Sequence, residues 1–218
     1  MAQTSANVKK GDHVQHHFVD SDQQFESAKM GMWIFLVTEI LFFGGLFLAY
    51  IVFRSWYPEL YLMASDHLDT FWGAVNTVVL IGSSLTVAMA IRSAQLNQQK
   101  GLIINLAITI ALACIFMVIK YFEYTHKFEL GIYPGAYYAY DGIPHDKANI
   151  FFSIYYMMTG LHGIHVLIGI GLMIWLIVRA RKGHFHSEYY TPVEITGLYW
   201  HLVDIIWIFL FPLLYLID

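Results

Sequence analysis

Five polar side chains interrupt long apolar runs of this sequence, at positions where almost every neighbour is hydrophobic. Carboxyl and imidazole groups can exchange protons, and imidazoles and carboxylates also bind metal ions. A polar group in such a setting carries either chemistry or a hydrogen bond to another buried segment. The five residues are Glu39, His162, His165, His201 and Asp204.

The histidines raise the question of a metal site. His162 and His165 are three residues apart, a spacing that places both on one face of a helix. Such a pair can bind one metal ion, but it also suits two hydrogen bonds to neighbouring helices, and packing is the favoured interpretation. His201 and Asp204 repeat the spacing, and a histidine beside an aspartate partly offsets the cost of burying both. We predict no metal site.

Glu39 lies near the middle of its apolar run. A carboxylate at that depth costs about 3 kcal/mol on insertion scales and normally faces protein or a cavity. Two interpretations stay open, a carboxyl group that handles protons and a neutral acid bonded to a neighbouring helix or a lipid headgroup. Because Glu39, the two histidines of the fourth run and Asp204 fall at similar depths, we hypothesise that the five polar residues form one buried network with a functional or structural role.

The segment from Glu123 to His126 has the form E-x-x-H, half of the motif of carboxylate-bridged di-iron bundles. Those bundles need two copies and further carboxylates, and this copy lies at the end of an apolar run. An interfacial glutamate and histidine is therefore the preferred interpretation. The sequence also has no Gly-rich phosphate loop, no nucleophile elbow and no clustered cysteines, so we predict no catalytic residue.

The composition excludes most soluble protein classes. Hydrophobic residues make up 58% of the 218 residues and charged residues only 13%, and the mean hydropathy is +0.55. Soluble domains carry roughly 25% charged residues, so a bilayer must solvate much of this surface. The net charge of −4 and the absence of a basic run exclude nucleic acid as a partner.

The apolar runs predict an all-α integral membrane protein, a bundle of five transmembrane helices. Crossing the hydrocarbon core takes about 20 helical residues, and each run comes close to that length or exceeds it. A polar tail over residues 1–28 precedes the membrane domain, residues 29–218. Glycines and Thr159 in the fourth run form a small-residue pattern that lets another helix approach closely. The predicted spans are approximately 30–53, 70–91, 102–125, 148–178 and 193–217.

The distribution of lysine and arginine predicts the orientation. Five spans put the two termini on opposite sides of the membrane, and the side of the N-terminus collects eight of these residues against four. Positive charge accumulates in cytoplasmic loops. We therefore expect a cytoplasmic N-terminus and a C-terminus outside.

Several segments together are similar to a known family. They are WIFLVTEILFFGGLFLAY (33–50), VNTVVLIGSSLTVA (75–88), KYFEY (120–124), TGLHGIHVLIG (159–169) and LYWHLVDIIWIFL (198–210). In this order and spacing they resemble subunit III of haem-copper cytochrome oxidases, in its five-helix form. The H-G-x-H-V and Y-W-H-x-V-D blocks are the most specific parts.

The resemblance implies where family-signature residues fall. Glu39 falls on the family's buried, carbodiimide-reactive carboxyl, and the two histidine blocks fall on its intramembrane signature. Seven-helix members have two further N-terminal helices where this chain has a polar tail, and position 120 is lysine where the family more often has an uncharged polar residue. The other matching positions are Glu123, Glu194, Trp200 and Trp207.

The resemblance also implies cofactors and partners. Subunit III binds no haem and no copper, because the redox centres lie in subunits I and II. It supports subunit I, binds structural phospholipid and helps to deliver protons, and it can belong to a larger respiratory supercomplex. We expect a non-catalytic chain in the inner membrane of a bacterium, within a complex that reduces oxygen to water and pumps protons.

Three alternatives stay open at this point. The nearest is subunit III of a quinol oxidase, which also has five helices. A membrane di-iron enzyme would use Glu123, His126 and the histidine pair of the fourth run, although the repeated histidine boxes of membrane desaturases are absent. A proton-coupled transporter would use Glu39 and Asp204, although transporters usually show internal repeats.

Overall fold

The computed structural model describes residues 14–145 and 147–217. Over these residues the regular secondary structure is helical, apart from one isolated β-bridge. Five helices are long and apolar enough to cross a bilayer, so the predicted fold class is confirmed. Their bounds are α1 Ser21–Trp56, α3 Thr70–Gln95, α4 Gln99–Glu129, α5 Ala148–Arg181 and α6 Thr191–Tyr215.

The ends of the helices follow from local capping chemistry. The Asp20 side chain accepts a hydrogen bond from the backbone N–H of Gln23, so α1 begins in the polar segment ahead of the apolar run. Asp69 caps α3 in the same way. Two short elements lie in the connections, α2 over Pro58–Ser65 and a 3-10 turn over Gly135–Tyr137. Proline in the first turn of α2 fits a position that needs no N–H donor.

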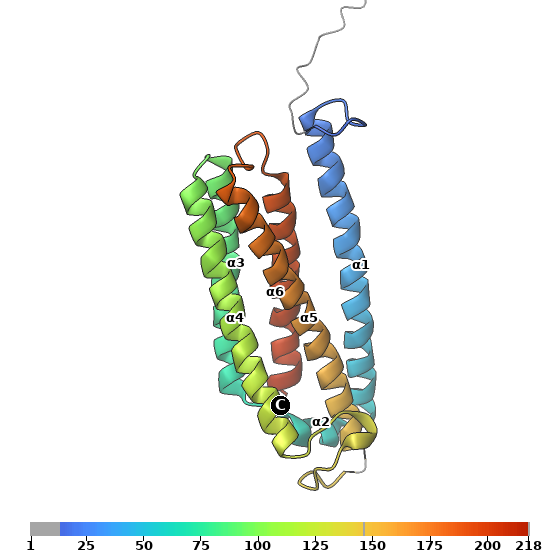
Figure 1. Ribbon diagram of the computed structural model, residues 1–218. Helices are drawn as coiled ribbons and strands as arrows, with labels where there is room; N and C mark the ends of the chain where they lie inside the picture. Colours follow the sequence, from blue (N-terminus) through green and yellow to red (C-terminus); the bar gives the residue numbers. More distant parts are fainter. Residues whose placement is uncertain (1–13, 146, 218) are drawn as a thin grey trace, which may run out of the picture.

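The helices run the length of the bundle, and the start of α1 and the end of α6 lie at opposite ends of it. Figure 1 shows α2, the loop after α4 and the C-terminus at one end of the bundle, which we call the α2 end. The first turn of α1 lies at the opposite end, which we call the N-terminal end. Glu123 and Lys127, in the last turns of α4, therefore belong to the α2 end.

The central helix is α6, which contacts α1, α3 and α5. Of its most apolar stretch, 56% is buried, whereas the corresponding stretch of α1 is only 17% buried. In Figure 1, α1 stands on one flank of the bundle and α3 and α4 stand on the other. Most of the apolar face of α1 is therefore left to lipid or to another protein.

Small residues bring α5 and α6 close at one point. A Cβ atom on Gly169 would lie 2.5 Å from the ring of Trp200, so no larger residue fits there without movement. A Cβ atom on Gly163 or Gly171 would meet nothing within 4 Å. Within the small-residue pattern of α5, the close approach therefore depends on Gly169, whereas Gly163 and Gly171 face open space.

Candidate functional site

Glu39 of α1 and His165 of α5 meet between their helices. The carboxyl Oε2 lies 3.1 Å from the ring Nε2. The other ring nitrogen, Nδ1, lies 2.8 Å from the carbonyl oxygen of Leu161. Because a carbonyl oxygen only accepts, Nδ1 carries a hydrogen and donates it. Nε2 then either accepts a hydrogen bond from a neutral Glu39 or donates one to an ionised Glu39, so the pair can exchange one proton across one hydrogen bond.

The neighbours of this pair fix the imidazole ring. Phe43 packs against the ring of His165 edge-on at 5.2 Å, and Tyr199 lies parallel to it at 6.4 Å. The Tyr199 hydroxyl also donates to the backbone carbonyl of His165. The side chains of Glu39 and His165 remain 18% and 14% exposed. A polar pair at membrane depth is expected to be covered by lipid or protein.

His162 is also on α5 but faces different neighbours. It is fully buried, and its ring lies 5.6 Å from Phe116 of α4 and 5.4 Å from Trp207 of α6. Residues three apart on a helix differ in direction by about 60°. That difference directs His165 toward α1 and His162 toward α4 and α6, so the two imidazoles do not converge on one point. Over the described residues, no three or more His, Cys, Asp or Glu side chains are placed to bind a metal ion.

His201 and Asp204 of α6 both lie near Ser84 of α3. The Ser84 hydroxyl is 2.6 Å from Nδ1 of His201, and it is also close to the carboxyl group of Asp204. Asp204 is buried, yet neither of its oxygens has a hydrogen-bond partner among the described residues. Ser84 has one hydroxyl hydrogen, and His201 lies in good position to accept it.

Two tryptophans of α6 attach the helix to α3. The indole N–H of Trp200 donates to the Ser83 hydroxyl, and that of Trp207 donates to the Thr77 hydroxyl, each at 3.0 Å. Both rings are fully buried. These contacts give the two family-signature tryptophans a packing role.

The five polar residues fall into three separate surroundings in the described part of the chain: Glu39 with His165, His162 alone, and His201 with Asp204 beside Ser84. No hydrogen bond between their side chains joins the Glu39–His165 pair to His162, His201 or Asp204. A single network that joins all five polar residues stays a prediction. Glu194 lies apart from them and forms an ion pair with Lys29, at 3.2 Å, between the starts of α6 and α1.

A second polar group is buried at the α2 end, centred on Glu123. One carboxylate oxygen of Glu123 accepts from Lys120 at 2.8 Å, and the other accepts from Lys127 at 3.0 Å. The second oxygen also accepts from two tyrosine hydroxyls, each at 2.7 Å. The group joins α4, α5 and α6, and we call it the Glu123 cluster. Its members are Lys120, Glu123, Lys127, Tyr155 and Tyr215.

The Glu123 cluster satisfies its own polar atoms. The ammonium group of Lys120 donates to Glu123, Tyr155 and Tyr215, which uses its three hydrogens. It also lies 5.3–5.5 Å from the centres of four aromatic rings, an arrangement that stabilises a cation. The side chains of Lys120, Glu123 and Lys127 are 8%, 7% and 4% exposed. Two positive charges and one negative charge are therefore held in the protein interior.

Sequence reasoning did not find the Glu123 cluster. The spacing K-x-x-E-x-x-x-K in α4 predicts ion pairs along one helix face. The two ion pairs within α4 could therefore have been predicted from the sequence. The two tyrosines come from distant segments, and their approach depends on how α5 and α6 pack. Their hydroxyl groups turn a helix-surface ion pair into a buried cluster that spans three helices.

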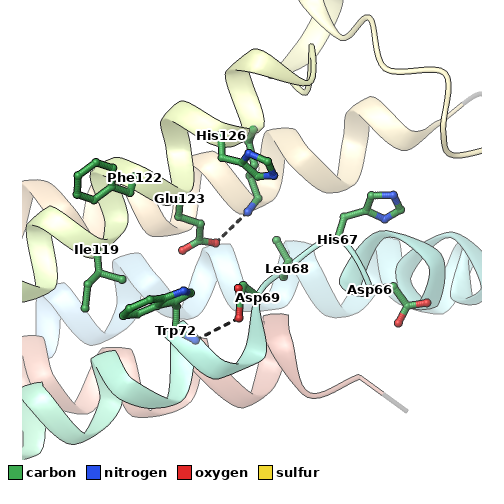
Figure 2. Close-up of a pocket in the computed structure, with 10 residues that line it drawn as sticks. Asp66, His67, Leu68, Asp69, Trp72, Ile119, Phe122, Glu123 and His126 are labelled. Carbon is green, nitrogen blue, oxygen red and sulfur yellow. Dashed lines mark hydrogen bonds and ion pairs between the residues drawn. The ribbon is translucent and has the colours of Figure 1, made fainter.

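A pocket of about 580 Å³ opens beside the Glu123 cluster at the α2 end (Figure 2). Glu123 and Lys127 line it from α4, and Asp69 and Trp72 line it from the start of α3. Glu123 accepts a hydrogen bond from Lys127 at 3.0 Å, and His126 lines the same pocket.

Comparison with known proteins agrees with the segments described above. The family model described as cytochrome c oxidase subunit III matches residues 8–218. The cytochrome c oxidase subunit 3 of Thermostichus vulcanus is 35% identical over 193 residues, 86% of each chain. That of Corynebacterium diphtheriae is 30% identical and covers 88% of each chain. That of Loxodonta africana is 31% identical over 87% of this chain and 69% of its own.

The match extends over nearly the whole chain and includes all five spanning helices. The chain belongs to the cytochrome c oxidase subunit III family.

Proposed function

We propose that this chain is the accessory, non-redox subunit III of a bacterial respiratory oxidase of the cytochrome c type. It assembles with subunits I and II, which carry the haem and copper, in a complex that reduces oxygen to water and pumps protons. The observation that carries the proposal is the family match over residues 8–218. Bacterial relatives named cytochrome c oxidase subunit 3 support it, and the quinol oxidase alternative is not favoured.

The exposed helix faces support an accessory role. Most of α1 is open toward the membrane, and the partly exposed Glu39–His165 pair lies on the same side of α5. A large partner on this side would cover both. The pair supplies one exchangeable proton, which is what a subunit that helps to deliver protons needs.

The other two alternatives find less support in the side-chain arrangement. A di-iron site would need Glu123 and the histidine pair together, whereas Glu123 is bonded by two lysines and two tyrosines. A transporter would need Glu39 and Asp204 along one path, and the two belong to different helix interfaces.

The proposed location is the bacterial inner membrane, with the N-terminal end in the cytoplasm. The loops and helix ends at the N-terminal end carry Arg92, Lys100, Arg179, Arg181 and Lys182. That excess of positive charge supports a cytoplasmic position. The α2 end, with its pocket and the Glu123 cluster, would then face outside.

The assembly is tested with a tagged chain purified in mild detergent. A reduced-minus-oxidised visible spectrum is recorded before and after the partner subunits are removed. Haem bands that accompany the chain and leave with the large partners are expected. A colourless preparation without partners, or haem that stays on the stripped chain, would overturn the proposal.

Glu39→Gln is expected to leave assembly intact and to change turnover. Glutamine keeps a hydrogen bond to His165 but has no ionisable group, so it cannot release and take up a proton at neutral pH. We expect several-fold faster inactivation during turnover and slower proton uptake, measured with a pH indicator in vesicles. Glu26→Gln, an exposed position earlier on α1, is the matched control. If turnover lifetime and proton uptake are both unchanged in Glu39→Gln, the pair has a packing role alone.

A further inference from the structure

A groove of about 620 Å³ runs along the surface between α4 and α5, on the side away from Glu39. On α4 its lining extends from Phe116 to Glu129, which is about 20 Å at 1.5 Å per residue. One half of a bilayer's hydrocarbon core is about 15 Å thick. The groove therefore begins at headgroup level, at the α2 end, and ends near the middle of the membrane.

The floor of the groove offers no free polar atom. The hydroxyls of Tyr124 and Thr159 are 2.5 Å apart and bond each other, and Thr159 also bonds its own helix backbone. Lys120, which lines the floor, has its three hydrogens engaged within the Glu123 cluster. A polar ligand would find no partner on this floor, whereas a hydrocarbon chain would leave every hydrogen bond intact.

Two glycines of α5 create the room. Gly160 and Gly163 line the groove, and a Cβ atom on Gly163 would meet nothing within 4 Å. Ile164 and Leu167 continue the lining and are 51% and 54% exposed. The lining of the deep half therefore consists mainly of small and apolar residues.

The mouth of the groove has the character of a headgroup site. Phe128 stacks on Tyr133 with ring centres 5.2 Å apart, which gives an aromatic wall at interface level. Glu129 is the exposed charged residue of the lining. A carboxylate at this position complements a positively charged headgroup.

We propose that this groove binds one acyl chain of a phospholipid whose headgroup carries an ammonium group. The occupant is a lipid chain because the groove follows α4 through one half of the bilayer, whereas a partner's transmembrane helix would cross both halves. The ammonium group lies at Glu129 and the chain passes Gly163. The proposal rests on the proposed function, because it locates on this chain the structural phospholipid that an oxidase subunit III is expected to bind.

The test uses three forms of the chain, each purified from native membranes with its copurifying subunits. They are the wild type, Gly163→Leu and Gly171→Leu. Leucine at 163 fills the groove, whereas Gly171 lies outside it on the same helix and is equally free of close neighbours. Native mass spectrometry counts the bound phospholipids. Gly163→Leu is expected to carry one phospholipid fewer than the wild type, and Gly171→Leu the same number.

Two further measurements keep the test decisive. In Glu129→Gln, the enrichment of ethanolamine over glycerol headgroups in the bound lipid is expected to fall several-fold. A photo-crosslinking amino acid at position 164 is expected to capture lipid. Equal lipid counts in all three forms, or capture of a partner polypeptide at position 164, would overturn the proposal. Haem recovered with each form reports oxidase assembly separately, so a failure of the proposed function is distinguishable from a failure of this site.

Discussion

Glu123→Ala is expected to lower the free energy of unfolding by about 3–5 kcal/mol, because it removes one partner of a buried ion cluster. Lys120 and Lys127 would keep their charges in the interior without a carboxylate, and two tyrosine hydroxyls would lose their acceptor. For a chain of this size the melting temperature should fall by about 10 °C. Thermal unfolding in detergent, followed by circular dichroism, measures the change.

Two comparisons identify the cause of this effect. Glu129→Ala removes an exposed carboxylate from the same helix and should change stability by about 0.5 kcal/mol or less. Replacing Glu123, Lys120 and Lys127 together by leucine and two methionines should recover most of the loss, because no unpaired charge remains. If the triple replacement is less stable than Glu123→Ala, the cluster stabilises the fold by more than charge pairing.

The membrane fold could be predicted from the sequence, because a segment that crosses a bilayer must be almost entirely apolar. A run of about 20 apolar residues has few alternatives to a transmembrane helix. The sequence does not show how long each helix is beyond the hydrocarbon. Helix α1 starts at Ser21, within a polar segment, because its first residue is set by the Asp20 cap and not by the edge of the bilayer.

The candidate site was accessible only in part. Glu39 and His165 stand out because each is polar among apolar neighbours, and the structure bonds them to each other. Their partnership depends on the packing of α1 against α5, which the residue pattern does not encode. His162 shares the spacing of His165, yet the 60° difference between them selects different neighbours.

The Glu123 cluster could not be predicted from the sequence, because the pattern within one helix does not show which residues of other helices pack against it. Lys120, Glu123 and Lys127 lie at the end of an apolar run, where charged side chains normally reach water. Burial comes from Tyr155 and Tyr215, which close over the charges from α5 and α6. Pairings between distant segments of this kind need the three-dimensional arrangement.

Trp200→Ala is expected to lower the free energy of unfolding by about 3–5 kcal/mol, the range for a buried large-to-small replacement. The ring is fully buried between α5 and α3, and its indole N–H donates to Ser83. Its removal would leave a cavity beside Gly169. Equilibrium unfolding followed by circular dichroism measures the loss.

The same contact predicts strong coupling between Trp200 and Gly169. In the wild type, Gly169→Ala places a Cβ atom 2.5 Å from the Trp200 ring, and overpacking of this kind costs about 1–3 kcal/mol. In the Trp200→Ala background the space is open, and alanine should stabilise the helix by up to about 1 kcal/mol relative to glycine. The sign of the Gly169→Ala effect should therefore reverse between the two backgrounds.

Gly171→Ala provides the matched control for this cycle. Its Cβ atom would meet nothing within 4 Å, so its effect should be the same small stabilisation in both backgrounds. Coupling energies between contacting residues reach about 0.5–3 kcal/mol, which unfolding measurements resolve. If Gly169→Ala costs the same with and without the Trp200 ring, the close approach of α5 and α6 does not depend on this contact. In that case the packing of α6 at the centre of the bundle would have to be explained by its hydrogen bonds to α3.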